Sequence, residues 1–264
     1  AGYDFMIQGM GGYMDLTGAP DGEPMKVGVA VADLFTGLHA VIGIQAALIA
    51  RQTTGRGQLV DMSLLDTMVA MLANQGMNYL VSGRAPKRMG NAHPNIVPYQ
   101  VFPVADGHII IATGNDRQFR DTCAILDLED IAFDPRFVHN AARVADRAEL
   151  IPLMEARTRT FRRDDLLGRL EAAHVPAGPI NSVADVFADP QVIARGLRLD
   201  LPSERAAGGS VPSIRNPIVL SDTPLAYTAG APGLGADTDA VLTGLGYDAA
   251  EIERLVAAGV IGRG

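Results

Sequence analysis

The sequence predicts an α/β or α+β fold in two lobes, because strand and helix patterns alternate irregularly along the chain. Its 264 residues are enough for one large domain or two modest ones. Hydrophobic residues make up 48% and charged residues 20%, which is the balance of a globular protein with a substantial core. We therefore expect a folded chain rather than a disordered one.

Charge and cysteine usage exclude several classes of function. The net charge of −8 disfavours binding to nucleic acid or to an anionic membrane surface. The longest apolar stretch, Val27–Ala50, contains Asp33, His39 and Gln45, so we expect no membrane span and no membrane partner. Cys123 is the single cysteine, which excludes an intrachain disulfide and fits a reducing compartment.

The first part of the chain is predicted to be mainly helical. Val27–Arg51 is apolar on all sides, which predicts a buried helix, and Gly55 suits its left-handed C-terminal cap. Leu59–Met62 is typical of a short strand. Ser63 begins a capping-box pattern that opens a helix running to Val81.

The middle of the chain is predicted to begin with a loop and a β-hairpin. Arg84–Pro98 is rich in Gly, Pro and Asn, as connecting loops are. Tyr99–Val104 and His108–Thr113 flank a turn that contains Asp106-Gly107. Asn115 or Asp116 can cap the helix that follows. We expect further helices at 141–161 and 164–173, and an extended segment at 175–180.

The last part is predicted to mix short helices with two strands. Ser182 caps one helix, and Asp189-Pro190 starts another with proline in its favoured first position. The strands are expected at 197–201 and 214–220, and closing helices at 237–245 and 248–258.

Spacing alone gives few candidates for chemistry. The five histidines form no close pair, so we expect no metal site. Cys123 lies on an apolar helix face and is predicted to be a core residue. Asp33 is a carboxylate in apolar surroundings at the start of a helix. It could be an N-cap, and a carboxylate favoured there by the helix dipole could also be a nucleophile in acyl chemistry.

Several segments together resemble family III CoA-transferases, and their order matches that family across essentially the whole chain. The segments that carry the resemblance are Gly2-Tyr3-Asp4-Phe5-Met6-Ile7-Gln8, Gly28-Val29-x-x-Ala32-Asp33-Leu34-x-x-Gly37, Thr54-Gly55-Arg56-Gly57-Gln58, Gly90-Asn91-Ala92-His93-Pro94 and Val175-Pro176-Ala177-Gly178-Pro179-Ile180. One such motif would be weak, whereas several in register are specific.

The resemblance implies a Rossmann-like large domain plus a small α+β domain, assembled as an interlocked homodimer. The family's chains are longer at the N-terminus, so we expect the N-terminal half of the large domain, with most CoA contacts, to be missing. No CoA-binding residue is therefore assigned here. The expected organisation is residues 1–84 for the remainder of the large domain, 85–97 for a linker, 98–180 for the small domain, and 181–264 for a segment that returns to the large domain.

The resemblance also implies a reaction and a set of site residues. The expected reaction moves coenzyme A from an acyl-CoA, in particular succinyl-CoA, to a dicarboxylate in the cytoplasm, with no permanently bound cofactor. Asp33 would be the nucleophile that carries a covalent aspartyl intermediate. The expected substrate-binding residues are Tyr3, Gln8, Gly90, Asn91, His93, Tyr99 and Gln100. Gly90-Asn91 could equally be plain linker, and Tyr99 and Gln100 plain strand positions.

Two other classes of function stay open on the sequence. The α-methylacyl-CoA racemases share the fold but use a Gly-His-Asp motif, and their histidine is Tyr3 here. A phenol is a poor proton exchanger near neutral pH, and racemases have a Glu at the position of Asp116. Both differences favour a transferase. The third possibility is a non-catalytic lobe that serves binding or assembly.

Overall fold

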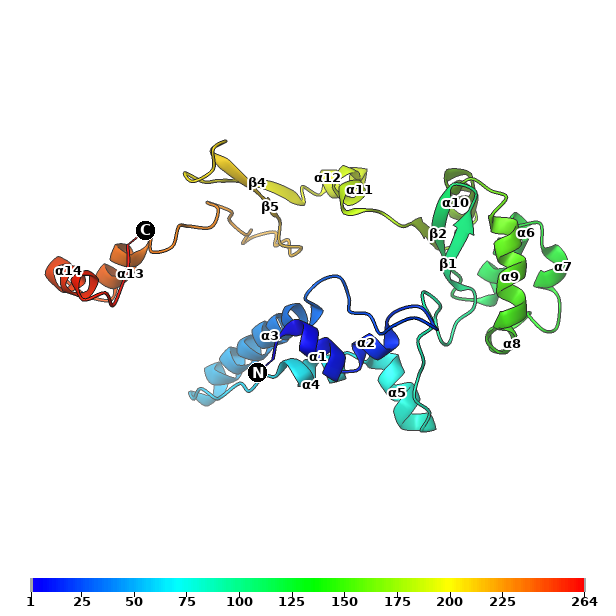
Figure 1. The fold of residues 1–264 in the computed structure, drawn as a ribbon, viewed down its shortest axis with the longest axis horizontal. Coiled ribbons are helices and arrows are strands. Elements are labelled where there is room, and N and C mark those ends of the chain that lie inside the picture. Colours follow the sequence, from blue (N-terminus) through cyan, green and yellow to red (C-terminus); the bar gives the residue numbers. More distant parts are fainter. Residues whose placement is uncertain (1, 264) are drawn as a thin grey trace. The chain divides into compact units, whose positions relative to one another are not determined.

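The computed structural model describes residues 2–263 and is drawn in Figure 1. The chain forms two compact units, Ala1–Ile180 and Asn181–Gly264. The first unit contains a helical part followed by a sheet-bearing part, and the second contains one pair of strands with short helices before and after it.

The helical part of the first unit has a small core. Its helices are α1 (Asp4–Met10), α2 (Tyr13–Leu16), α3 (Val31–Thr54), α4 (Leu64–Ala70) and α5 (Ala73–Ser82). Ile7, Ala32 and Met68 are the buried apolar residues at its centre, one each from α1, α3 and α4. This cluster fixes the first turn of α3 against α1, which matters for the site described below.

Helix α3 forms as expected, and Gly55 ends it with a φ of 69°. The expectation that it is buried is wrong for this chain, because Ala32 is its only buried residue. Leu34, Ile42 and Ile49 are 60%, 61% and 65% exposed. By length and composition α3 is also long and apolar enough to cross a membrane. The expectation that its polar residues exclude a membrane span is therefore wrong. Core helices of soluble proteins pass the same test.

Two local expectations after α3 are corrected by tertiary contacts. Leu59–Met62 is extended but is not a strand, since no neighbouring strand pairs with it among residues 2–263. Ser63 does cap the next helix by accepting a hydrogen bond from the Asp66 amide at 3.0 Å. That helix is divided into α4 and α5, because the Tyr13 hydroxyl donates to the Met71 carbonyl at 2.6 Å and Ala73 has a positive φ of 48°.

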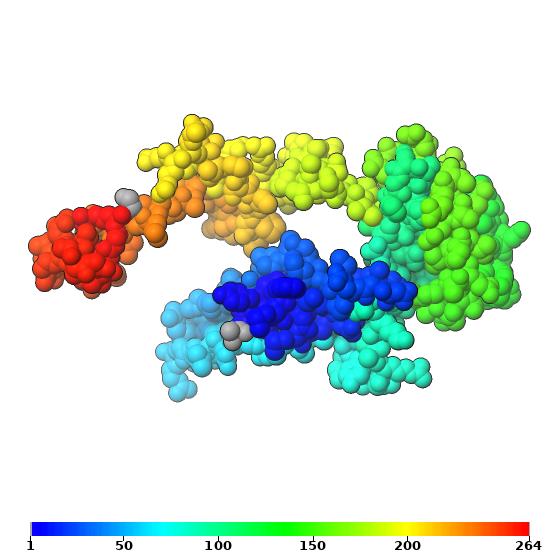
Figure 2. Space-filling model, in the orientation of Figure 1, coloured from blue at the N-terminus to red at the C-terminus, as the bar shows by residue number. Residues whose placement is uncertain are grey.

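The sheet-bearing part packs helices against a three-stranded antiparallel sheet in the order β1-β2-β3. The strands are β1 (Tyr99–Val104), β2 (Gly107–Ala112) and β3 (Ala177–Pro179), and the helices are α6 (Asp116–Ile125), α7 (Glu129–Ala132), α8 (Asn140–Ala145), α9 (Arg147–Thr158) and α10 (Arg163–Ala172). The hairpin is as predicted, and Asn115 caps α6 by accepting from the Gln118 amide at 2.9 Å. In Figure 2 this part, coloured green, is a continuous mass of packed side chains.

Arg143 on α8 is the buried polar centre of the sheet-bearing part. Its side chain is 1% exposed, and its three nitrogens donate to the Val97 carbonyl at 2.6 Å, the Phe137 carbonyl at 2.8 Å and the Asp116 carboxylate at 2.8 Å. The guanidinium also lies 4.3 Å from the ring centroid of Phe119. The site thus satisfies a buried charge with acceptors from three separate segments.

The Arg143–Asp116 pair predicts an acid-sensitive fold. The hydrogen bond from Arg143 holds the pKa of Asp116 below its usual value, against the opposing effect of burial and with help from His139. A lowered folded-state pKa stabilises the fold above the unfolded-state pKa, and this stabilisation is lost as the pH falls below about 4 towards the folded-state value. We expect Asp116→Asn to unfold with a shallower acid dependence than the unsubstituted chain, as measured by circular dichroism between pH 7 and pH 2. Equal slopes in the two proteins would contradict this.

The second unit is built from α11 (Val183–Ala188), α12 (Pro190–Ala194), β4 (Arg198–Pro202), β5 (Ser210–Ile214), α13 (Thr238–Gly244) and α14 (Ala249–Ala257). Ser182 forms a complete capping box at α11, as predicted, and Asp248 forms another at α14, where the sequence predicted only the helix. The second strand was expected at 214–220 and instead ends at Ile214, because β4 pairs with it from Pro202↔Ser210 to Arg198↔Ile214. The turn through Gly208-Gly209 therefore fixes the register earlier in the chain.

The architecture is a mixed helix and sheet fold. Every strand pairing within residues 2–263 is antiparallel, so the part of the chain described here contains no parallel sheet of the Rossmann type. The boundary between the two units falls between Ile180 and Asn181. The boundaries at residues 84/85 and 97/98 stay predictions.

Candidate active site

Asp33 is the third residue of α3 and its side chain is exposed. The N-cap is Ala30, so the interpretation of Asp33 as the cap of this helix is wrong. Within residues 2–263 no hydrogen bond or ion pair engages the Asp33 carboxylate. A carboxylate in the first turn of a long helix is in a favourable field for negative charge. It is therefore accessible, free of partners in the described chain, and suited to attack on an electrophile.

Helix α1 packs against the first turn of α3, which carries Asp33. Tyr3 immediately precedes α1 and is 78% exposed, so its phenol is open to solvent. Gln8 is 0% exposed, and its amide is engaged in hydrogen bonds to Asp4, Val27 and Val29. That Gln8 contacts substrate stays a prediction. Asp4 was not singled out from the sequence, although its position four residues before Gln8 places both on one face of a helix.

The linker turn at Gly90 is tied to the loop that leads into α3. The Gly90 amide donates to the Gly18 carbonyl at 3.0 Å, and Arg88 donates to Asp15 and to the Gly22 carbonyl at 3.1–3.2 Å. Gly90 has a φ of 59° and Gly18 a φ of 121°, both in the left-handed half of conformational space. These contacts hold Gly90 against α2 and the loop that precedes α3.

Gly18 has no room for a side chain. A Cβ there would lie 2.9 Å from the Glu23 carbonyl oxygen and 3.2 Å from Met25 Cγ. We expect Gly18→Ala to destabilise the helical part by about 1–3 kcal/mol, measured by hydrogen exchange of its amides. Gly28→Ala is the matched control, since no atom lies within 4 Å of a Cβ at Gly28. Equal stability of the two variants would show that this loop tolerates rearrangement.

His93 and Tyr99 are brought together by the structure. Their ring centroids are 5.2 Å apart, and the His93 amide donates to the Tyr99 carbonyl at 3.0 Å. Arg147 on α9 fixes this corner by donating to the carbonyls of His93 and Pro94 at 3.1 Å and 3.0 Å. The pair is thus held by the sheet-bearing part and not left on a free linker.

Asn91 and Gln100 also lie together, at a cavity of about 350 Å³ between the linker turn and the hairpin. Its other polar lining residues are His108, Glu155 and Arg159. Arg159 is 62% exposed, and its contact with Glu155 is long at 3.9 Å. Its guanidinium can therefore also bind an anion. His108 and Arg159 were not identified from the sequence, because only the packing of α9 against β1 places them here.

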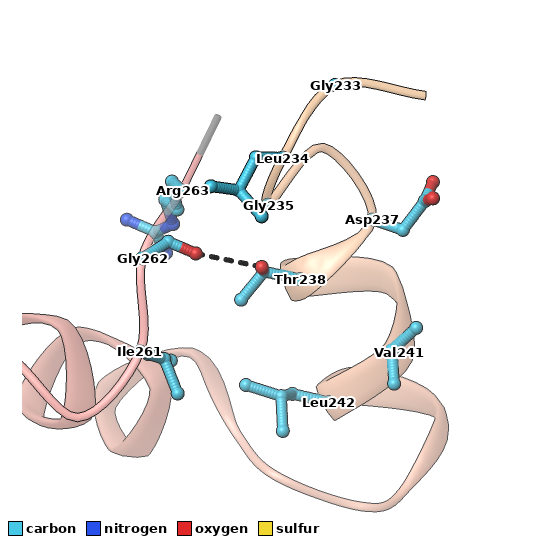
Figure 3. Close-up of a pocket in the computed structure, with 10 residues that line it drawn as sticks. All are labelled: Gly233, Leu234, Gly235, Asp237, Thr238, Val241, Leu242, Ile261, Gly262 and Arg263. Carbon is cyan, nitrogen blue, oxygen red and sulfur yellow. Dashed lines mark hydrogen bonds between the residues drawn. The ribbon is translucent and has the colours of Figure 1, made fainter. Parts of the chain in front are cut away.

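Two other features of the chain are a cavity in the second unit and a buried thiol. Figure 3 shows a cavity of about 640 Å³ in the second unit, where the Thr238 hydroxyl donates to the Gly262 carbonyl at 2.8 Å. Its charged lining residues are Asp237 and Arg263, and Arg263 is engaged by Asp239 and Glu253. Cys123 is a buried core residue, and this burial raises the pKa of its thiol to about 12. No cluster of three or more His, Cys, Asp or Glu side chains that could hold a metal occurs within residues 2–263.

Comparison with known proteins identifies the family. The family model described as CoA-transferase family III matches residues 1–238. The chain belongs to this family. Within this CoA-transferase family, it is 54% identical over 245 residues to a succinate–glutarate CoA-transferase of Agrobacterium fabrum, covering 93% of this chain and 61% of that protein. It is 38% identical over 263 residues to the succinyl-CoA:glutarate CoA-transferase of Homo sapiens, covering 99% of this chain and 59% of that protein.

Solved structures support the same assignment. A CAIB/BAIF family protein from Brucella suis is 57% identical, with a TM-score of 0.76, and the match covers 93% of this chain and 63% of that one. The chain thus spans about three fifths of the length of the relatives it matches. Family membership confirms the resemblance carried by the Gly2–Gln8, Gly28–Gly37 and Gly90–Pro94 motifs.

Proposed function

We propose that this protein transfers coenzyme A from succinyl-CoA to a dicarboxylic acid such as glutarate. The observation that carries the proposal is the 54% identity, over 93% of this chain, to a protein named succinate–glutarate CoA-transferase. The mouse and human relatives carry a corresponding name at 39% and 38% identity. The activity of the whole protein is a proposal because the chain spans about three fifths of these relatives.

In the proposed mechanism the Asp33 carboxylate attacks the thioester carbonyl of succinyl-CoA, which expels CoA thiolate and forms a mixed anhydride. The thiolate then attacks the aspartyl carbonyl, releasing succinate and leaving an Asp33–CoA thioester. The acceptor carboxylate then attacks the Asp33–CoA thioester, which expels CoA thiolate and forms a second mixed anhydride. The thiolate attacks the acceptor carbonyl, so that CoA leaves on the acceptor and Asp33 is restored. Covalent catalysis of this kind divides one difficult transfer into easier steps. The exposed, unpartnered carboxylate of Asp33 supports this role.

The acceptor is proposed to lie near the linker turn. Gly90 and Asn91 would cover the intermediate, with His93, Tyr99 and Gln100 facing the acceptor. The cavity that Asn91 and Gln100 line with Arg159 supports this placement, since a guanidinium suits a second carboxylate. Tyr3 is proposed to contact the acyl-CoA, because its side chain is 78% exposed and it directly precedes Asp4, which binds the start of α3.

The exposed apolar surface of α3 supports a proposal about assembly. We infer that residues 1–84 are the remainder of a larger CoA-binding domain and that 85–97 connect it to a small domain at 98–180. The two fifths of the relatives not matched here would cover α3, and a homodimer would complete the site. A patch this large and apolar marks a contact surface. The proposed compartment is the cytoplasm, with α3 covered by protein rather than by lipid.

The proposed function is tested by incubating the protein with succinyl-CoA and glutarate and following both thioesters by liquid chromatography and mass spectrometry. Glutaryl-CoA should appear as succinyl-CoA disappears, mole for mole. Butyrate, which lacks the second carboxylate, should be a much poorer acceptor. Deuterium uptake at the α-carbon of a branched acyl-CoA, without any CoA transfer, would instead make the protein an isomerase.

A further inference from the structure

Helix α3 begins without a side-chain cap of its own. The first amides of a helix need acceptors from outside it, and its N-cap residue Ala30 has none to offer. The acceptor comes from α1: the Ala32 amide donates to Asp4 Oδ1 at 2.8 Å, across 28 residues of sequence. Ala32 is fully buried and directly precedes Asp33. The backbone at the candidate nucleophile is thus fixed by a distant carboxylate.

Gln8 completes this anchor. Its Nε2 donates to Asp4 Oδ2 at 2.8 Å, and its Oε1 accepts from the Val27 amide at 2.9 Å. The Gln8 Nε2 also lies 3.4 Å from the Val29 carbonyl oxygen. Both oxygens of Asp4 are therefore used, and α1 holds the segment entering α3 at successive points. Hydrogen bonds to a carboxylate are stronger than neutral ones, which makes Asp4 the centre of the arrangement.

We propose that Asp4 is a positioning residue for the nucleophile, a proposal that rests on the assignment of Asp33 in the proposed function. Asp4 acts through the backbone. By fixing the Ala32 amide it sets the direction in which the next side chain leaves the helix. A misplacement of about 1 Å can cost on the order of 100-fold in rate. Asp4 itself need not contact the acyl-CoA.

The hydrogen-bond chemistry predicts which substitution breaks the anchor and which restores it. In Asp4→Asn one side-chain oxygen can still accept from Ala32, but the new NH₂ group faces Gln8 Nε2, so two donors meet. Gln8 cannot rotate its amide to relieve this, because its Oε1 accepts from Val27. Adding Gln8→Glu supplies an acceptor to the new amide and keeps one for Val27. The double variant exchanges donor and acceptor between positions 4 and 8 and keeps the contact to Val27, and it loses only the long 3.4 Å hydrogen bond to the Val29 carbonyl.

The test measures the rate at which succinyl-CoA modifies Asp33, by peptide mass spectrometry over time. We expect Asp4→Asn to react about 10- to 100-fold more slowly and the double variant Asp4→Asn/Gln8→Glu to recover most of that loss. Asp61→Asn, an exposed carboxylate between α3 and α4, is the control and should react at the unsubstituted rate. If Asp4 served only general stability, Asp4→Asn would lower the melting temperature and leave the rate of Asp33 modification unchanged well below that temperature. Modification of Asp4→Asn at the unsubstituted rate would overturn the proposal.

A second readout separates this inference from the proposed function. Hydrogen exchange of the Ala32 amide, measured without any substrate, should accelerate at least tenfold in Asp4→Ala and Asp4→Asn and return in the double variant. If Asp33 is never modified in the unsubstituted protein, the proposed function fails and the exchange data still decide whether Asp4 fixes Ala32. Unchanged exchange at Ala32 would overturn the positioning role even if the transferase activity is confirmed.

Discussion

Replacing Asp33 by asparagine is expected to lower CoA transfer by a factor on the order of 10⁴ or more, as removal of a covalent nucleophile does. An amide cannot attack the thioester, so no intermediate forms. Stability should change by less than about 1 kcal/mol, because only the helix-dipole interaction is lost. The side chain is exposed and no described residue bonds to it. Steady-state kinetics together with a thermal melt measure both effects.

Asp66→Asn is the matched control for this substitution. Asp66 is an exposed aspartate at the third position of α4, as Asp33 is in α3. It therefore loses the same charge at the same place in a helix, and we expect no more than a small change in rate. Similar losses in both variants would indicate that charge in a first helical turn, and not nucleophilic attack, explains the effect.

Removing the guanidinium of Arg143 is expected to have the largest effect on stability. Arg143→Ala leaves the carboxylate of Asp116 and the carbonyls of Val97 and Phe137 without their donor. The Asp116 carboxylate is 38% exposed, so solvent screens the loss of the ion pair itself. The larger cost comes from the two buried carbonyls, at about 1–3 kcal/mol for each acceptor left without a donor. Arg143→Lys should also destabilise, because a single ammonium cannot reach three acceptors in a fork. Hydrogen exchange of peptides from residues 97–175 measures this locally, without assuming that the two units unfold together.

Arg136→Ala provides the comparison. Arg136 lies over a phenylalanine ring, 5.0 Å from the Phe137 centroid, and pairs with Asp134 and Glu149, but its side chain is 57% exposed. Surface ion pairs contribute little to stability, because water and salt screen them. If Arg136→Ala and Arg143→Ala raised exchange equally, burial of the Arg143 network would not be the source of its contribution.

Local signals predicted the elements that depend on neighbouring residues. The Asp106-Gly107 turn specifies the hairpin, and side-chain oxygens at Asn115 and Ser182 cap the helices that follow them. In each case the partner lies within a few residues, so the sequence contains the whole interaction. These are the parts of the fold that a single sequence determines well.

Interactions between distant residues explain what could not be predicted. The side chain that accepts a hydrogen bond from the first turn of α3 is Asp4 and not Asp33, and the contact spans 28 residues, so no local pattern reveals it. Leu59–Met62 has strand-like composition, but a strand also needs a partner. The burial expected for α3 depends on chain that packs against it, and residues 2–263 leave most of its surface exposed.

The candidate site likewise combines a residue that the sequence indicated with contacts that only tertiary packing creates. Its apolar surroundings at a helix start singled out Asp33 as either an N-cap or a nucleophile, and the resemblance of whole motifs favoured the nucleophile. The contacts between His93 and Tyr99 and the cavity shared by Asn91 and Gln100 follow from packing of the linker against the hairpin. Arg159 and Asp4 were missed because each reaches the site from an element remote in sequence.

The most direct test of the central claim is peptide mass spectrometry of the protein after incubation with succinyl-CoA and trapping with hydroxylamine or borohydride. The account predicts a modification on the peptide that contains Asp33, absent in Asp33→Asn and present in Asp66→Asn. Transfer of CoA to glutarate with Asp33 unmodified, or with undiminished rate in Asp33→Asn, would contradict it.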